Sequence, residues 1–147
     1  GAVELDMVLN IGRLIAGDTA FVEQDIRAVA EAAHRRGAIV KVILENAYLN
    51  DDQKRTGCQI AEQAGADFVK TSTGFAPGGA TLDDAALMRS AVSANVQIKA
   101  AGGVRTLDAV LAYRAAGCTR CGATASAAIM DEAIRREQEG ILHEIEG

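Results

Sequence analysis

The sequence predicts an α/β fold made of five strand–helix units. Apolar, β-branched runs alternate with amphipathic helical segments along the 147 residues. A glycine recurs where a helix should end and the next strand begin, at Gly37, Gly65 and Gly117. Glycine readily adopts the left-handed conformation that closes a helix. The spacing of these glycines corresponds to one and then two βα units.

Five strands are expected, at residues 3–9, 39–44, 68–69, 96–99 and 119–123. Their near-continuous apolar character is typical of a parallel sheet that is covered on both faces. Between the strands, Val22, Ile26, Val29 and Ala33 recur at helical spacing. Polar residues that cap helices begin the later helices, at Asn50 or Asp51, at Thr81 and at Thr106. The last helix is expected over residues 126–145.

Two architectures accommodate five βα units. One is a doubly wound open sheet, and the other is five-eighths of a (β/α)₈ barrel. The first residues, GAVELDMV, repeat the junction of glycine and strand. This repeat predicts that one or more βα units precede the first strand, although a glycine from an expression tag would look the same. We expect residues 1–147 to form a single domain that is part of a TIM-type barrel.

Composition and charge exclude several classes of protein. A net charge of −5 and a pI near 5.0 argue against nucleic acid as a partner, because phosphate neutralisation needs a basic surface. No apolar run approaches the length of a membrane span, and the N-terminus lacks a signal-peptide pattern. Three cysteines, Cys58, Cys118 and Cys121, indicate reduced thiols and a cytoplasmic setting. The C-x-x-C at 118–121 leads into a strand and is interpreted as packing.

Lysine residues occur on two neighbouring strands at positions that should be buried. Lys70 and Lys99 are separated by about one βα unit, so they should lie at the same height on adjacent parallel strands. Burial and mutual repulsion both lower the pKa of a lysine. A lysine that is partly neutral near pH 7 can attack a carbonyl and form a Schiff base. The alternative is that each lysine forms a structural ion pair with a buried acid, and Asp6 is available for either arrangement.

A third lysine, Lys41, is interpreted differently. Lys41 and Glu45 have the same parity along their strand and should point to one face. Lys41 comes early in the strand, away from the end where α/β proteins place their chemistry. We expect it to be a layer residue inside the barrel, balanced by an acid.

Glycine-rich loops follow the last two strands. AAGGVRT (100–106) and GATAS (122–126) each lead from a strand into a helix. Backbone N–H groups in such loops can bind a phosphate, and barrels often place this site after their last two strands. The alternative is that the glycines only make tight turns. FAPGGAT (75–81) is a third flexible loop, directly after Lys70.

Several motifs together resemble the class I deoxyribose-phosphate aldolases. They are DFVKTSTGF, IKAAGGVRT and ELDMVLNIG, with GGATLDDAALMR and KVILE in support. The resemblance covers essentially the whole chain. It implies a (β/α)₈ barrel lyase that cleaves 2-deoxy-D-ribose 5-phosphate reversibly into glyceraldehyde 3-phosphate and acetaldehyde. It implies no cofactor and no metal, because the Schiff base acts as the electron sink.

The resemblance also implies roles for individual residues. Lys70 matches the Schiff-base lysine, Lys99 the second lysine that tunes it, and Asp6 the acid that assists proton transfer. Substrate or phosphate contacts are expected at Thr71, Gly74, Gly102, Gly103, Arg105, Gly122 and Thr124.

The sequence departs from this family in ways that bear on activity. The family's first three βα units have no counterpart here, and Asn46 replaces a usual threonine. Five strands leave two unpaired sheet edges, which predicts self-association into a homo-oligomer and reduced or absent activity of this chain by itself. Two alternatives therefore remain open. One is a self-associating barrel fragment with residual phosphate binding, and the other is a different phosphosugar lyase or isomerase.

Overall fold

The computed structural model describes residues 1–143 as parallel strands that alternate with helices. The strands are β1 (Glu4–Val8), β2 (Ile39–Ile43), β3 (Phe68–Lys70), β4 (Gln97–Val104) and β5 (Cys118–Ala123). The helices are α1 (Ile11–Ile15), α2 (Thr19–His34), the short 3₁₀ helix η1 (Asn46–Tyr48), α3 (Asp51–Gln63), α4 (Leu82–Ala91), α5 (Leu107–Ala115) and α6 (Ser126–Gln138).

The strand order decides between the two architectures. The sheet runs β1-β2-β3-β4-β5, with every neighbouring pair parallel. A doubly wound sheet reverses its strand order at a switch point, whereas a barrel keeps the order of the chain. The sequential order therefore confirms the barrel-type prediction. Within the described residues β1 and β5 are the open edges of the sheet, as expected for a partial barrel.

The predicted helix boundaries are set by side-chain caps and by glycines. Asn50 forms a capping box with Gln53, and the Thr81 and Thr106 side chains accept hydrogen bonds from backbone N–H groups of the first turn. Gly37 and Gly65, which follow α2 and α3, have φ angles of 70° and 89°. Gly117 follows α5 with φ of 91°. These observations confirm the glycine junctions predicted from the sequence.

Two boundaries differ from the prediction by more than one residue. Helix α6 ends at Gln138 rather than at residue 145, because the chain takes the left-handed conformation at Gly140 (φ 69°). The remainder of that predicted helix, from residue 144 on, lies outside the described residues. Strand β4 continues to Val104, beyond the predicted end at residue 99. Gly102 and Gly103 have positive φ there, and a shift in register allows Val104 to pair with Ala123.

The hydrophobic core lies between one face of the sheet and helices α1 to α5. Val40, Val42, Val69 and Ile98 are completely buried on this face. The prediction that both faces are covered holds only in part for the described residues, because Lys41, Phe68 and Lys70 are buried on the opposite face whereas most of β1 is exposed. On the edge strand β1, Leu5 and Val8 remain partly exposed.

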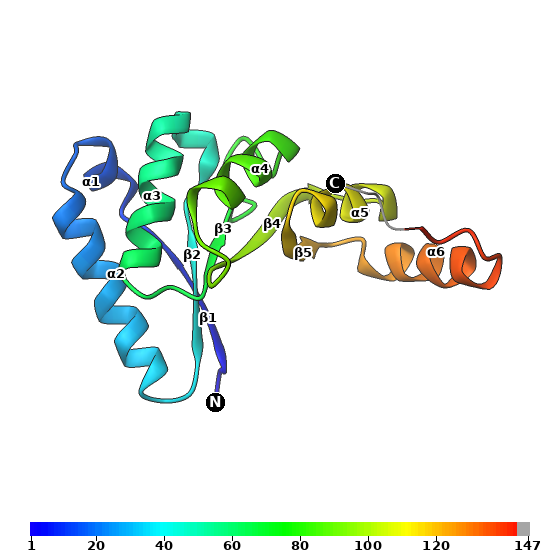
Figure 1. Ribbon diagram of the computed structural model, residues 1–147, viewed down its shortest axis with the longest axis horizontal. Coiled ribbons are helices and arrows are strands. Elements are labelled where there is room, and N and C mark those ends of the chain that lie inside the picture. Colours follow the sequence, from blue (N-terminus) through cyan, green and yellow to red (C-terminus); the bar gives the residue numbers. More distant parts are fainter. Residues whose placement is uncertain (144–147) are drawn as a thin grey trace.

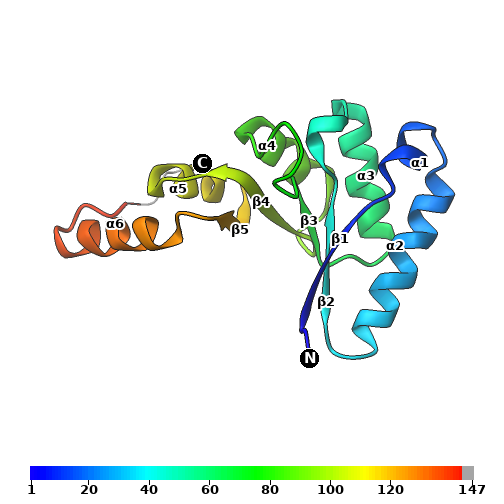
Figure 2. The same ribbon diagram turned by 180° about the vertical axis from the view of Figure 1, so that it is seen from behind.

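The helices are divided between the two ends of the molecule. Helices α1, α2 and α3 lie at one end, and α5 and α6 lie at the other, with α6 extending beyond β5 (Figure 1). Figure 2 shows the same division from behind, with β1 running along the sheet to the N-terminus. Within residues 1–143, no helix is long and apolar enough to cross a membrane.

Candidate active site

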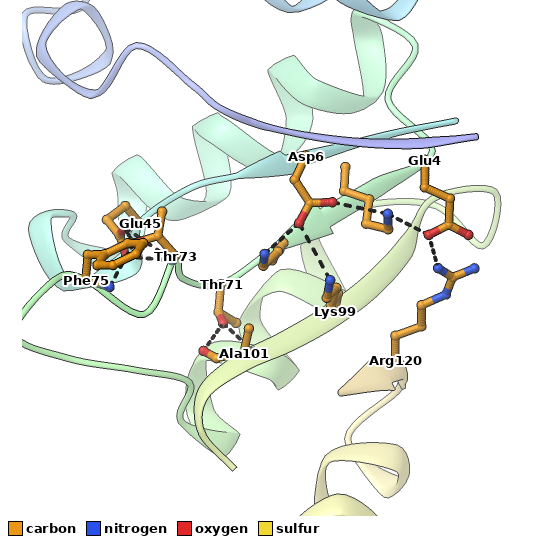
Figure 3. A network of polar contacts seen from close by, with 11 residues as sticks. Glu4, Asp6, Glu45, Thr71, Thr73, Phe75, Lys99, Ala101 and Arg120 are labelled. Atoms are coloured by element: carbon orange, nitrogen blue, oxygen red, sulfur yellow. Dashed lines mark hydrogen bonds and ion pairs between the residues drawn. The ribbon is translucent and has the colours of Figure 1, made fainter. Parts of the chain in front are cut away.

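The carboxylate of Asp6 brings three lysines together on the polar face of the sheet (Figure 3). Its Oδ2 atom lies 2.6 Å from Lys70 Nζ and 3.6 Å from Lys99 Nζ. Its Oδ1 atom lies 3.1 Å from Lys41 Nζ. The two lysines of the predicted site therefore form ion pairs with the same carboxylate oxygen.

Strand register explains why these side chains meet. Lys70 on β3 pairs directly with Lys99 on β4, which confirms that the two lysines lie at the same height. Asp6 on β1 pairs with Lys41 on β2. Side chains alternate between the two faces of a strand, so these four point away from the apolar core.

Lys41 has the structural role that the sequence predicted. Its side chain is only 4% exposed, and its Nζ contacts Glu4 at 2.7 Å as well as Asp6. Burial would lower the pKa of Lys41, but hydrogen bonds to Glu4 and Asp6 outweigh that effect and raise it. Glu4 also pairs with Arg120, so an ion-pair chain runs from β1 to β5 across this face.

The electrostatics of the cluster favour an ionised Asp6 and a lysine that loses its proton more easily. Burial would raise the pKa of Asp6, but hydrogen bonds from Lys70 and Lys41 outweigh it, and the pKa falls to about 2. The pKa of Lys99 is lowered, first by burial and then by the positive charge of Lys70. The direction of this shift at Lys99 agrees with the sequence-based expectation that burial and repulsion lower a lysine pKa.

A pocket of about 350 Å³ opens beside the two lysines. Its walls include both lysines and six of the seven residues predicted to contact substrate or phosphate, namely Gly74, Gly102, Gly103, Arg105, Gly122 and Thr124. The absence of a side chain at Gly122 matters here. A Cβ at this position would meet Ala101 Cβ at 3.2 Å and Lys99 Cε at 3.7 Å, so glycine leaves room beside the lysine.

Thr71, the seventh of these residues, lies elsewhere. It is fully buried and does not line the pocket. Its hydroxyl donates to the Ala101 carbonyl oxygen at 3.0 Å and accepts from the Ala101 N–H at 3.1 Å. Because both hydrogen bonds join the residue that follows β3 to the middle of β4, Thr71 fixes the alignment of the lysine-bearing strands. The structure thus gives Thr71 a structural role, and its predicted contact with the substrate stays a prediction.

Two features of the site were missed by sequence reasoning. The first is the Glu4–Arg120 ion pair, which joins residues far apart in the chain and depends on the curvature of the sheet. The second is Glu45, whose carboxylate accepts hydrogen bonds from Thr73. The sequence placed Glu45 on the same strand as Lys41, but β2 ends at Ile43 and Glu45 has φ of 57°. No pattern in the sequence signals that left-handed residue.

The three cysteines are free thiols in buried or partly buried positions. Cys118 and Cys121 both lie in β5, and burial raises the pKa of the Cys118 thiol to about 11 and that of Cys121 as well. These thiols stay protonated near neutral pH, in agreement with the packing interpretation of the C-x-x-C motif. Within residues 1–143, no cluster of three or more His, Cys, Asp or Glu side chains could hold a metal ion.

Comparison with known proteins identifies the family. The model of the DeoC/LacD family aldolases matches residues 1–127. The chain belongs to the DeoC/LacD aldolase family. A deoxyribose-phosphate aldolase of Thermococcus gammatolerans is 50% identical over 93% of this chain and 61% of its own length. One of Streptococcus sanguinis is 54% identical over 88% of this chain and 58% of its own length.

Solved structures of aldolases share the fold. The structure of the Aeropyrum pernix deoxyribose phosphate aldolase, which is described as tetrameric, has a TM-score of 0.81 at 28% identity. It covers 90% of this chain, which in turn covers 55% of it. The chain thus spans about three-fifths of the length of the curated relatives named above. This family membership accounts for the lysine-bearing motifs found in the sequence.

Proposed function

We propose that this chain carries the catalytic centre of a class I deoxyribose-phosphate aldolase. The observation that carries the proposal is the pairing of Lys70 with Lys99 on adjacent strands, with one oxygen of Asp6 within reach of both. In this proposal Lys70 is the Schiff-base nucleophile, and the substrate is 2-deoxy-D-ribose 5-phosphate.

The reaction requires a neutral amine and a path for protons. In this proposal neutral Lys99 accepts the Lys70 proton by way of Asp6 Oδ2, and burial and the charge of Lys70 favour that form by lowering the pKa of Lys99. Neutral Lys70 adds to the aldehyde carbon of the open-chain sugar. Loss of water from the adduct gives an iminium, which draws electrons from the neighbouring carbon–carbon bond.

The remaining steps release both products. A base removes the proton of the C3 hydroxyl, the C2–C3 bond breaks, and glyceraldehyde 3-phosphate leaves. The electron pair of that bond forms an enamine of acetaldehyde on Lys70. Protonation of the enamine carbon regenerates an iminium, and water hydrolyses it to acetaldehyde and free Lys70. The Asp6–Lys99 pair is the group that we propose for relaying these protons.

The pocket provides the complementary contacts for a phosphate. Glycines 102 and 103 on β4 and Gly122 on β5 bring backbone close to the open space, and Arg105 supplies a positive charge. Backbone N–H groups together with a guanidinium are common ligands of phosphate oxygens. We therefore propose that the phosphate of the substrate lies between the ends of β4 and β5.

Reductive trapping tests the proposal. The 147-residue chain is incubated with acetaldehyde and sodium borohydride, and the modified lysine is located by peptide mass spectrometry. We expect one ethyl group on Lys70 and none on Lys54, which lies on α3 and pairs with Asp84. Lys70→Arg should abolish the adduct. Failure of the chain to form an adduct at any lysine would refute the proposal for this chain.

The open edges of the sheet favour a second candidate role, which is association between copies of this chain. The edge strand β1 exposes Leu5 and Val8, and exposed parallel edges promote association between chains. We propose that the chain forms a homo-oligomer through these edges, in a cytoplasmic setting consistent with its free cysteines. Light scattering measures the mass of the particle in solution. We expect a multiple of the chain mass, and a monomer would contradict the association. Phosphate binding without lysine trapping would favour the self-associating, inactive fragment, and trapping at Lys99 alone would favour a different lyase.

A further inference from the structure

Glu45 holds a buried carboxylate just beyond the end of β2, separate from the lysine cluster. The residue is 4% exposed. Its carboxylate accepts hydrogen bonds from the Thr73 backbone N–H at 3.2 and 3.3 Å and from the Thr73 hydroxyl. Burying a carboxylate is unfavourable unless donors of this kind compensate for the lost water. The contact with Thr73 therefore explains how the charge is accommodated.

The backbone at Glu45 is unusual as well. Its φ of 57° makes it the only non-glycine residue with positive φ among residues 1–143. Such a conformation persists where the surrounding structure holds it, and it is concentrated near functional sites. On either side of Glu45, the Leu44 N–H donates to the Lys70 carbonyl at 2.9 Å and the Asn46 N–H donates to the Thr71 carbonyl at 3.0 Å. The chain on both sides of Glu45 is thus hydrogen-bonded to the backbone of Lys70 and of Thr71, which follows it.

The hydrogen bonds continue from Thr73 into the wall of the pocket. The Thr73 hydroxyl accepts from the Phe75 N–H at 3.1 Å, and Gly74 between them has φ of 98°. Thr73 and Gly74 line the pocket together with Lys70, whereas Glu45 does not. Figure 3 shows Glu45 beside Thr73 and Phe75, apart from the group around Asp6.

We propose that Glu45 is a positioning residue for the reaction. It holds Thr73 and Gly74 in the conformation that leaves the pocket open beside Lys70 and presents backbone to the bound phosphosugar. This role rests on the proposed aldolase function, because the reaction rate by which it is measured is that of Schiff-base formation at Lys70. It differs from the role of Asp6, because Glu45 acts through Thr73 and is not part of the ion-pair cluster.

Variants of Glu45 and Thr73 test the inference in the 147-residue chain. Glu45→Ala removes the acceptor, and Thr73→Val removes the hydroxyl at nearly constant shape. We expect each to slow acetaldehyde trapping at Lys70 by on the order of tenfold or more, since misplacement by about 1 Å can cost two orders of magnitude in rate. Thr73→Ser keeps the hydroxyl and should restore the wild-type rate. Glu45→Gln retains one oxygen acceptor, so its trapping rate should lie between those of Glu45→Ala and the wild type.

A matched control separates positioning from general destabilisation. Asp84→Asn alters another largely buried carboxylate, which pairs with Lys54 away from the pocket. Its trapping rate should stay at the wild-type value at a temperature where circular dichroism shows all variants to be folded. The pH at which trapping is half-maximal should be unchanged in Glu45→Ala, because Glu45 contacts none of the lysines, but should shift in Asp6→Asn.

A second measurement stays informative if the wild-type chain fails to trap acetaldehyde. The amide signals of Thr73 and Gly74 are followed by NMR during hydrogen exchange and during titration with inorganic phosphate. Glu45→Ala should speed exchange at Thr73 and weaken the response of Gly74 to phosphate, whereas Asp84→Asn should change neither. Unchanged exchange and phosphate response in Glu45→Ala would overturn the inference. Equal losses of trapping in Glu45→Ala and Asp84→Asn would also overturn it.

Discussion

The two faces of the sheet contrast sharply although they are built from the same strands. On the helix-covered face, Val42, Val69 and Ile98 are fully buried among apolar neighbours. On the other face, Lys70, Lys99 and Asp6 form a cluster whose contacts are ionic. The apolar face stabilises the fold. The rigid strands then keep the like charges of Lys70 and Lys99 close together on the polar face.

The largest expected effect is a difference in stability between variants of Ile98 and Lys99, which are neighbours in β4 and point to opposite faces. Ile98→Ala should lower the free energy of unfolding by about 2–5 kcal/mol, because it leaves a cavity in the core. Lys99→Ala should change it by less than about 1 kcal/mol, since its ion pair is partly exposed and its charge repels Lys70. Urea denaturation of both variants measures the difference. Equal losses of stability would show that the two faces contribute alike.

An intermediate effect is expected at acid pH. The folded-state pKa of Asp6 is about 2, below its ordinary value of 3.8. Its contribution to stability is therefore complete above the ordinary pKa and is lost as the pH falls toward 2. Asp6→Asn should flatten the decrease in urea midpoint between about pH 5 and about pH 2. Ile98→Val, an uncharged change on the other face, should shift the midpoint equally at every pH.

The smallest effect is a change in the pKa of one lysine. Lys70 lowers the pKa of Lys99, and Lys41 does so more weakly. Lys70→Gln should therefore raise the pKa of Lys99, and Lys41→Gln should raise it less. NMR titration of the Lys99 side chain measures both shifts. A Lys99 pKa that does not rise in Lys70→Gln would contradict the repulsion between the two lysines.

Local sequence signals predicted much of this arrangement correctly. The caps at Asn50, Thr81 and Thr106 are read from side chains that bond to the adjacent helix turn. The adjacency of Lys70 and Lys99 follows from the repeating length of a βα unit. In each case the deciding interaction is close in sequence or is repeated at a fixed period.

The features that sequence reasoning missed depend on contacts between distant segments. The Thr71 hydroxyl bonds to Ala101 because the two strands pair in one particular alignment, which no local pattern signals. Glu45 reaches Thr73 only because its backbone turns left-handed after β2.

The sequence by itself determined the alternation of strands and helices, the glycine junctions, and the lysines and acid of the candidate site. Only the tertiary structure decided how the charges are distributed among partners. Asp6 touches three lysines, and Glu4 connects Lys41 to Arg120 on the far edge of the sheet. Sheet curvature and strand register set these distances, and both arise from the packing of the whole sheet against its helices rather than from any local stretch of residues.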